Sequence, residues 1–208
     1  MSEKSHYTDK EITDSNIVFH DEFDAEIYDW KWGKKYGSEE MERMLGEYCV
    51  YMGEELGRVG RYLDIGCGTG TAVVNLSLTD RIEEAHGSDI SIGMLRACHK
   101  NAKGAHTHVI LTQSNAESLP YRDESFDFIT CHAILHHVPH PEQVVREVHR
   151  LLKPGGRALV AEPVFHISRN EFQESIAAMK GAGLRVEPGP RIPFSRTAVL
   201  RGAGDEKA

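Results

Sequence analysis

The sequence predicts an α/β fold in which a mostly parallel β-sheet carries helices on both faces. Short apolar segments alternate along the chain with stretches whose apolar residues recur at helical spacing, and this alternation is typical of parallel strands joined by helices. The last two apolar segments are interpreted as a closing antiparallel pair. The segments expected to form strands are 61–65, 84–89, 107–113, 126–132, 158–161, 184–187 and 197–201.

Helices are expected between most of these strands. Residues 70–79 and 91–103 follow the first and second strands, and a third helix is predicted to begin at Pro141, because proline suits the first helical turn. Pro154-Gly155-Gly156 is predicted to end that helix. A last helix is expected near 171–180, and residues 38–56 carry apolar side chains at helical spacing ahead of the first strand.

Composition indicates one compact domain and excludes some partners. The chain has 208 residues, with 40% hydrophobic and 27% charged residues, which is an ordinary globular balance. Its formal net charge of −8 repels phosphate backbones, so no nucleic-acid partner is expected. No apolar run approaches the roughly 18 residues that a membrane span needs. We expect a monomer or a homodimer.

The four cysteines favour a reducing compartment. Cys49, Cys67, Cys98 and Cys131 form no Cys-x-x-Cys pair, and Cys67 lies within a glycine-rich turn where a disulfide would obstruct a ligand. The first twenty residues are charged and polar, unlike a secretory signal. We therefore expect a cytoplasmic location.

A glycine-rich turn is the most informative motif. The segment Arg61-Tyr-Leu-Asp-Ile-Gly-Cys-Gly-Thr-Gly70 runs from an apolar strand into three alternating glycines, which can take positive φ and let a ligand approach the backbone. A dinucleotide-binding turn has the spacing G-x-G-x-x-G, whereas this turn has G-x-G-x-G with Asp64 two residues before the first glycine. An acid there can hold a cationic amine, so the motif favours S-adenosylmethionine over NAD.

A second acid stands at the end of the second strand. Asp89 follows the glycine turn by about 20 residues, where a carboxylate can accept hydrogen bonds from both hydroxyls of a ribose. Asp89 and Ser91 can also cap the helix that begins at Ile92, and the two roles are compatible.

These motifs and three later ones resemble class I S-adenosylmethionine-dependent methyltransferases. Asn115-Ala-Glu-Ser-Leu-Pro120, Ser125-Phe-Asp-Phe-Ile-Thr-Cys-His-Ala-Ile-Leu-His-His-Val138 and Leu151-Leu-Lys-Pro-Gly-Gly-Arg157 are similar in order and spacing to the small-molecule enzymes related to the ubiquinone and menaquinone methyltransferases. The resemblance covers roughly residues 60–162. It implies a Rossmann-like, seven-stranded sheet, with S-adenosyl-L-methionine as cofactor and S-adenosyl-L-homocysteine as product.

The resemblance also implies which residues contact the cofactor. The methionine end is expected at the glycine loop, the ribose at Asp89, and the adenine at the segment after the third strand, where the family usually has an aspartate in place of Asn115. An asparagine oxygen can accept the same hydrogen bond from the adenine amine, although Asn115 can also be an ordinary turn residue. The cofactor-binding residues expected are Asp64, Gly66, Cys67, Gly68, Gly70, Asp89, Ile90, Asn115, Ala116 and Cys131.

Covering of the substrate is expected from the N-terminal part. The family commonly inserts covering segments between Glu162 and the last helix, and this chain has almost none, so residues 17–57 are predicted to form a helical cap or substrate lid. The aromatic residues of this segment are expected either to line a substrate pocket or to pack a helix onto the sheet. Tyr28 aligns with the tyrosine of the family's lead-in segment and is a candidate catalytic residue. Residues 1–16 are expected to be flexible, and 58–208 to form the cofactor-binding domain.

Histidines cluster after the fourth strand at positions 132, 136, 137 and 140. The spacing suits metal ligands, but Pro139 interrupts the helix that would align them and the Leu-His-His-Val run belongs to the resemblance, so no metal is assigned. His136 is the candidate general base.

The sequence therefore predicts an enzyme that moves a methyl group to an oxygen, nitrogen or carbon nucleophile of a small organic acceptor by in-line displacement. Two alternatives remain open: a non-catalytic S-adenosylmethionine-binding partner or regulatory protein, and a methyltransferase that acts on tRNA or protein.

Overall fold

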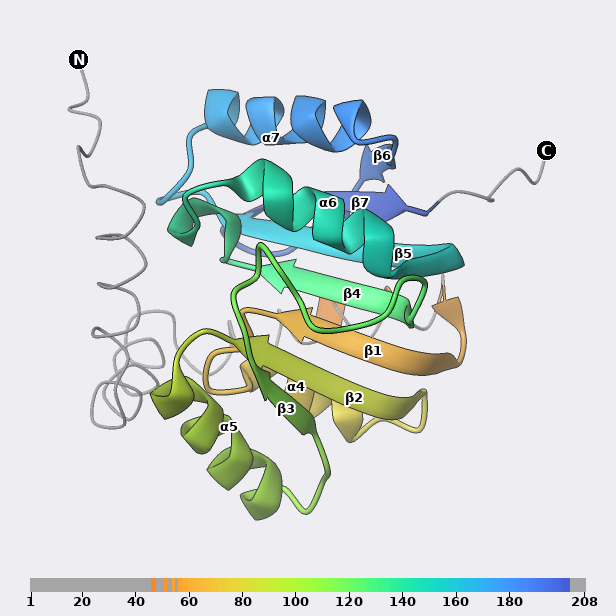
Figure 1. The fold of residues 1–208 in the computed structure, drawn as a ribbon, viewed down its shortest axis with the longest axis vertical. Helices are drawn as coiled ribbons and strands as arrows, with labels where there is room; N and C mark the ends of the chain where they lie inside the picture. The colour runs from red at the N-terminus through yellow and green to blue at the C-terminus, as the bar shows by residue number, and fades with distance from the viewer. Residues whose placement is uncertain (1–45, 48–50, 52–53, 55, 203–208) are drawn as a thin grey trace.

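A seven-stranded sheet forms the central layer of the protein (Figure 1). The structure is a computed structural model that describes residues 46–47, 51, 54 and 56–202. The strands are β1 (Val59–Ile65), β2 (Ile82–Asp89), β3 (Ile110–Gln113), β4 (Phe126–His132), β5 (Leu152–Pro163), β6 (Arg185–Pro188) and β7 (Ser195–Arg201). The helices are α4 (Thr71–Ser77), α5 (Ile92–Gly104), α6 (Pro141–Leu151) and α7 (Arg169–Gly181), with a 3-10 turn η2 (Leu135–His137).

The strand order β3-β2-β1-β4-β5-β7-β6 confirms the predicted fold class. Strands β1 to β5 pair in parallel, and β7 pairs antiparallel with both β5 and β6. The chain moves outward from β1 to β3 and then returns to β4 on the other side of β1. The carboxyl ends of β1 and β4 therefore form a topological switch point, where ligands of such sheets bind.

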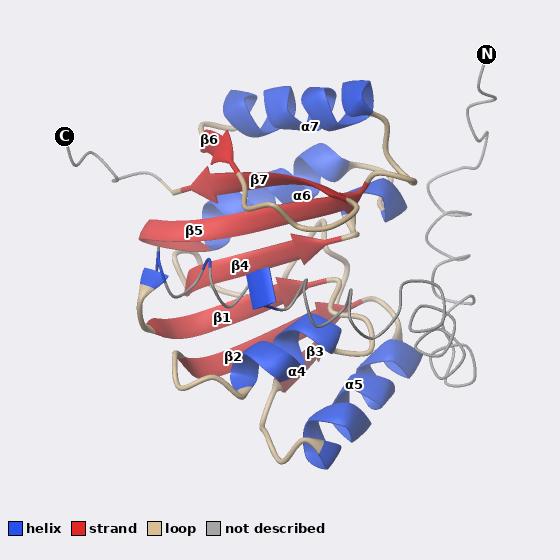
Figure 2. Cartoon of the chain, turned by 180° about the vertical axis from the view of Figure 1, so that it is seen from behind, coloured by secondary structure: helices blue, strands red, loops and turns tan. Residues whose placement is uncertain are grey.

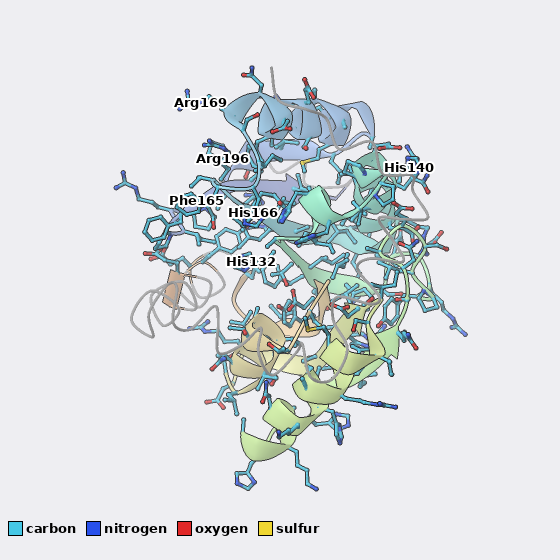
Figure 3. All side chains as sticks on the ribbon, turned by 90° about the vertical axis from the view of Figure 1, so that its left-hand side faces the viewer. His132, His140, Phe165, His166, Arg169 and Arg196 are labelled. Atoms are coloured by element: carbon cyan, nitrogen blue, oxygen red, sulfur yellow. The ribbon has the colours of Figure 1, made fainter. Side chains whose placement is uncertain are left out.

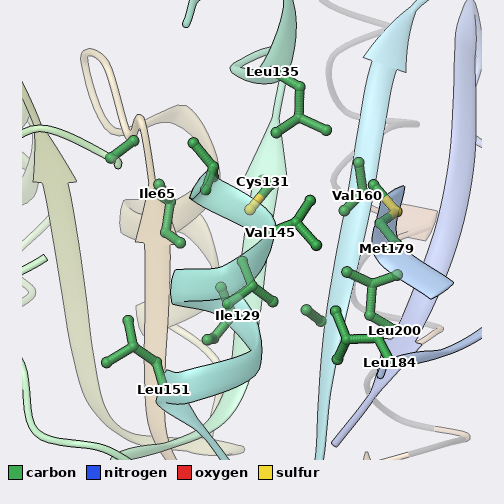
Figure 4. Close-up of a cluster of buried hydrophobic side chains, with 14 of the residues drawn as sticks. Ile65, Ile129, Cys131, Leu135, Val145, Leu151, Val160, Met179, Leu184 and Leu200 are labelled. Carbon is green, nitrogen blue, oxygen red and sulfur yellow. The ribbon is translucent and has the colours of Figure 1, made fainter. Parts of the chain in front are cut away.

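In the described part of the chain, α6 and α7 cover one face of the sheet and α4 and α5 the other, as the views from opposite sides show (Figures 1 and 2). Helices α6 and α7 bury Val145 and Met179 against Ile65, Ile129 and other residues on one face (Figure 4). Helices α4 and α5 bury their apolar residues against the opposite face, and Tyr51 and Leu56 pack there too. Burial on both faces explains why the strands are almost continuously apolar.

The predicted end of α6 is wrong. The helix stops at Leu151, and Leu152 already begins β5, so Pro154-Gly155-Gly156 lies inside the strand. Phe126 pairs with Leu152 and Phe128 with Arg157, so the extra residues of β5 loop out of the ladder. A Cβ at Gly156 would lie 2.9 Å from the Lys153 carbonyl oxygen, so glycine here permits a bulge and does not end a helix.

Strand β3 is shorter than the expected segment 107–113. It begins at Ile110, and Thr107 instead donates its backbone N–H to the Ala102 carbonyl at the end of α5. The hydroxyl of Thr107 contacts that of Ser77 at 2.9 Å. These contacts join the residue to the helices, so it does not extend the sheet.

The predictions for residues 1–16 and for most of 17–57, including Tyr28, lie outside the described residues. Among the residues that the structure describes, no helix is both long enough and apolar enough to cross a bilayer.

Helix α7 begins with a capping box that offers a test of local stability. The Ser168 hydroxyl accepts from the Glu171 N–H, and the Glu171 carboxylate accepts from the Ser168 N–H at 2.7 Å. Replacing Ser168 with alanine removes one of these bonds and is expected to lower stability by about 1 kcal/mol. For a chain of this size the thermal midpoint should fall by about 2–4 °C. Gln173→Ala, at an exposed position of the same helix, is the control, and an equal loss in both variants would contradict the assignment.

Candidate cofactor site

A cavity opens at the carboxyl ends of β1, β2 and β4, at the switch point of the sheet. It contains about 840 Å³ of space, a volume that includes its open mouth. The glycine loop, the end of β2, the turn after β3 and the segment after β4 form its walls. The lining residues are Gly66, Gly68, Ser88, Asp89, Ile90, Met94, Ser114, Asn115, Ala116, His132, Ala133, Ile134, His137, Val138 and Pro139.

The glycine loop needs its glycines for conformation and for space. Gly66 and Gly68 have φ of 70° and 54°, which side-chain-bearing residues rarely adopt. A Cβ at Gly66 would lie 2.7 Å from the Ile134 side chain, and one at Gly70 would lie 2.4 Å from the Cys98 sulfur. The loop therefore packs tightly against α5 and the segment after β4, with the backbone of Gly66 and Gly68 on the cavity.

Asp89 joins the glycine loop to α5. One carboxylate oxygen accepts from the Gly68 N–H at 2.9 Å, and the other accepts from the Ser91 N–H at 2.9 Å. Ser91 is the N-cap of α5 and accepts from the Met94 N–H. Asp89 thus supports the start of α5 and also lines the cavity, which are the two roles that the sequence suggests for it.

The adenine-side residues predicted from the sequence lie on the same cavity. Ile90, Asn115 and Ala116 line it together with Met94, which the sequence analysis did not single out. The Asn115 side-chain oxygen accepts from the Glu117 N–H at 2.9 Å, which is an Asx turn. Because a carbonyl oxygen has two lone pairs, this turn leaves acceptor capacity on the same atom.

Asp64 does not line the cavity but is buried beside it. Its Oδ1 accepts from the Thr130 hydroxyl at 2.6 Å, the Thr130 oxygen lies 2.7 Å from the Tyr62 hydroxyl, and the Val73 N–H in α4 also bonds the carboxylate. Burial raises the pKa of Asp64 to about 7, although the bonds from Thr130 and Val73 lower it and the charge of Asp89 raises it. The carboxylate ties β1 to β4 and to the first turn of α4.

The two predicted cysteines and Gly70 also lie away from the cavity lining. The Cys67 side chain is buried among residues of α4 and α5, and its contact with Cys98, together with burial, holds the pKa of its thiol well above the usual value. Cys131 is buried under α6, and burial raises the pKa of its thiol. Neither thiol is in the ionised form that reacts as a nucleophile.

The histidines after β4 have different surroundings. His132 lines the cavity, and burial lowers its pKa to about 4, so its imidazole is neutral at neutral pH. His136 lies behind the lining: its Nδ1 is 2.5 Å from Glu162 Oε2, and its ring lies 4.0 Å from that of His137, which does line the cavity. Within the described chain, His136 Nε2 is buried without a hydrogen-bond partner.

Glu162, at the end of β5, organises the segment after β4. One of its oxygens accepts from the N–H groups of Ile134 and Leu135, at 3.0 and 2.8 Å, while the other contacts His136. The side chain is fully buried, and these three donors satisfy its charge. Ala133 supports this turn with a left-handed φ of 55°.

Residues 63–160 match the model of a family described as a methyltransferase domain. Over this stretch the chain is similar to methyltransferase domains. Curated relatives are also similar to part of the chain. The "Uncharacterized methyltransferase YcgJ" of Bacillus subtilis is 39% identical over 104 residues, which is 49% of this chain and 40% of that protein. The "Ubiquinone/menaquinone biosynthesis C-methyltransferase UbiE" of Bartonella tribocorum is 38% identical over 109 residues, again 49% of this chain and 40% of the relative. The chain thus spans less than half the length of these relatives.

Solved structures share the fold of this chain. A putative S-adenosyl-L-methionine-dependent methyltransferase from Methanococcus maripaludis superposes with a TM-score of 0.75, covering 100% of this chain and 99% of the other at 16% identity. At this identity the likeness concerns the fold alone, and it agrees with the predicted Rossmann-like, class I architecture.

Besides Met94, sequence reasoning missed Glu162, which organises the segment after β4. A signal is present in the sequence, because an acid directly after Ala158-Leu-Val-Ala161 ends an otherwise apolar strand. The sequence does not show that its partners are backbone groups 27 and 28 residues earlier. Among the residues described, histidine, cysteine and acidic side chains form no cluster of metal-ligand type.

The raised pKa of Asp64 predicts how the stability of the protein depends on pH. The ordinary carboxyl value is 3.8 and the folded value is about 7, so between these values the folded chain binds more protons than the unfolded chain. The contribution of Asp64 to stability therefore falls as pH rises through this window. Asp64→Asn should have a thermal midpoint that improves relative to wild type between pH 5 and pH 8.

The control is Asp80→Asn, at an exposed position after α4. Thermal unfolding followed by circular dichroism at several pH values measures both differences. A difference between Asp64→Asn and wild type that stays constant with pH would contradict the prediction.

Proposed function

We propose that this protein transfers a methyl group from S-adenosyl-L-methionine to an oxygen, nitrogen or carbon nucleophile of a small organic acceptor. The observation that carries the proposal is the cavity at the switch point of a methyltransferase domain, where the glycine loop and Asp89 meet. The relative named for ubiquinone and menaquinone biosynthesis supports a small-molecule acceptor. A cytoplasmic enzyme, monomeric or homodimeric, is part of the proposal.

The residues of the cavity fit this cofactor. The carboxylate of Asp89 lines the cavity, and carboxylate oxygens can accept hydrogen bonds from ribose hydroxyls. The apolar side chains of Ile90 and Met94 offer surfaces to the adenine ring, and Asn115 offers a polar edge. The backbone of Gly66 and Gly68, free of side chains, would receive the methionine end, with Asp64 behind it.

The protein's main contribution is positioning. The bound sulfonium cofactor supplies an electrophilic methyl group, and S-adenosyl-L-homocysteine leaves after transfer. The cavity walls hold the acceptor in line and at short range, which removes most of the entropy barrier of the reaction. The segment after β4 excludes water from one side through Ile134, Val138 and Pro139. Residues 17–57, with Tyr28, are proposed to cover the other side.

His136 is proposed to remove the acceptor's proton. When its Nδ1 carries a proton that is donated to Glu162, Nε2 becomes the basic atom of the ring. Nε2 is the buried atom that has no partner in the described chain, so a donor group of the acceptor would satisfy it. This pairing of a buried carboxylate with an oriented imidazole is an arrangement that suits a general base.

The first experiment is titration calorimetry of the full chain with S-adenosyl-L-methionine and, separately, with S-adenosyl-L-homocysteine. Binding of both supports the proposed cofactor and leads to a screen of small acceptors by mass spectrometry. Failure of a folded protein to bind either one would overturn the proposal. Binding without transfer to any small acceptor would favour a non-catalytic binding protein.

Asp89→Ala is expected to weaken binding of S-adenosyl-L-homocysteine at least about tenfold, because the charge-assisted bonds to the ribose are lost. Ser91→Ala is the matched control, since it removes the cap of the same helix without touching the carboxylate. Calorimetry measures both affinities, and circular dichroism verifies folding. An unchanged affinity in Asp89→Ala would remove this residue from the site.

His136→Gln is expected to lower kcat by roughly a hundredfold, while affinity for S-adenosyl-L-homocysteine stays within about twofold of wild type. His140→Gln, at a half-exposed position in the next turn, serves as the control. Steady-state assays with an acceptor from the screen measure kcat. An equal loss of cofactor affinity in His136→Gln would indicate a structural role instead of a base.

A further inference from the structure

Two aromatic rings are exposed side by side at the carboxyl edge of the sheet. Phe165 follows β5 and Phe194 precedes β7; their side chains are 62% and 46% exposed. The rings stack with centroids 5.8 Å apart and planes inclined by 30°. Figure 3 looks at this edge and shows Phe165 on the same side of the molecule as His132 and His166. Two phenyl rings that are stacked but exposed form a flat apolar surface.

The backbone of Phe194 adopts a conformation that is unusual for a bulky residue. Its φ is 54°, in the left-handed region where glycine and asparagine are favoured and a bulky residue is strained. The Phe194 carbonyl accepts from the Val164 N–H at 2.8 Å, which joins the two loops that carry the rings. A strained backbone that presents an exposed aromatic ring is typical of a binding surface.

Two arginines flank this surface. Arg196 donates its Nε to the Ile167 carbonyl at 3.4 Å, and Arg169 is exposed at the first position of α7 (Figure 3). Among the described residues, neither guanidinium forms an ion pair. Glu162 lies opposite Arg196 in the β5–β7 ladder, but its oxygens are taken by two backbone N–H groups and by His136. In a chain of net charge −8, this is a local cationic site.

The surface is continuous with the proposed reaction centre. His166 follows Phe165, and its ring lies 4.8 Å from that of His136. The ring of His136 in turn contacts His137, which lines the cofactor cavity. The His166 ring therefore lies between a molecule on the two phenyl rings and the buried imidazole of His136. The phenyl rings are on the side of the site remote from the adenine end.

We propose that Phe165, Phe194, Arg169 and Arg196 form the acceptor-binding shelf, and that the acceptor is a small planar molecule carrying an anionic group. The rings hold its flat, apolar part by stacking, and the guanidinium groups hold its carboxylate or equivalent oxyanion by charge-assisted hydrogen bonds. This inference rests on the proposed function, because it names the class of substrate for the same site. The charge of the shelf distinguishes this acceptor from a neutral quinone or phenol.

The binding test uses the full chain saturated with S-adenosyl-L-homocysteine and three probes. The probes are 3-hydroxy-2-naphthoate, which is planar and anionic, 2-naphthol, which is planar and uncharged at pH 7, and cyclohexanecarboxylate, which is anionic and not planar. Calorimetry is expected to give an affinity for 3-hydroxy-2-naphthoate about tenfold higher than for either other probe. Binding of the cofactor product is measured first, so a failure of the proposed function is seen separately from a failure of the shelf.

Variants assign the preference to the shelf. The double variant Arg169→Gln and Arg196→Gln should bring the affinity for 3-hydroxy-2-naphthoate to that for 2-naphthol. Arg185→Gln, on β6 at the end of the strands away from the shelf, should leave both affinities unchanged. Phe194→Gly should weaken both naphthalene probes by about fivefold, while the thermal midpoint stays equal or rises because the left-handed backbone is relieved. Loss of stability in Phe194→Gly would mean that the ring packs for folding, and it would overturn the proposal.

Three other results would also overturn it. These are equal binding of the charged and uncharged planar probes by wild type, no binding of any probe to a protein that binds S-adenosyl-L-homocysteine, and unchanged affinities in the arginine double variant. Sedimentation of wild type and Phe194→Gly tests whether a second copy of the chain occupies the shelf instead. A dimer that Phe194→Gly converts to a monomer would identify the shelf as an interface between two copies of the chain.

Discussion

The site depends on one buried carboxylate. Asp64 accepts from the Thr130 hydroxyl in β4 and from the Val73 N–H in α4, so it fixes the two central strands and the first turn after the glycine loop in one arrangement. The glycine loop between β1 and α4 is tightly packed, because Gly66 contacts Ile134 and Gly70 contacts Cys98 without room for a methyl group. A hydrogen-bonded carboxylate in the interior thus helps to set the position of a loop in which every second residue is glycine. The cost of burying that group is visible in its raised pKa.

The same principle operates at the neighbouring strand. Glu162 is fully buried, and three donors converge on it from the segment after β4. A buried acid that accepts from several backbone N–H groups is held rigidly. Movement of the carboxylate would leave these buried donors without hydrogen-bond partners, which is costly. His136 therefore has a fixed orientation, with its second nitrogen held in a protein interior instead of in water. The two acids, Asp64 and Glu162, support adjoining walls of the cavity without lining it.

Much of the fold could be predicted from sequence because its signals are local. Apolar runs in Tyr62–Ile65 and Phe126–Cys131, and the glycines between β1 and α4, are recognisable without knowledge of their partners. Asp89 was predictable for the same reason, since its partner Ser91 is two residues away. The bonding of Asp64 was not, because Thr130 lies 66 positions later and meets it only when β1 pairs with β4. The end of α6 was misjudged because Pro154-Gly155-Gly156 suits a helix stop and a strand bulge equally, and pairing with β4 decides between them.

The strand order also separates two tasks along the chain. The cofactor cavity is built by residues up to Pro139, from the parallel part of the sheet, whereas the aromatic and cationic shelf belongs to the segments that flank β5 and β7. Strand β7 inserts antiparallel beside β5, and this reversal carries the loop of Phe194 back to the edge where the parallel strands end. Under the proposed function, substitutions in that loop would alter acceptor selectivity and leave the proposed cofactor site intact. Because β7 runs antiparallel to β5, the residues proposed to select the acceptor are confined to short segments beside these strands. A few substitutions there would be enough to change the proposed substrate range.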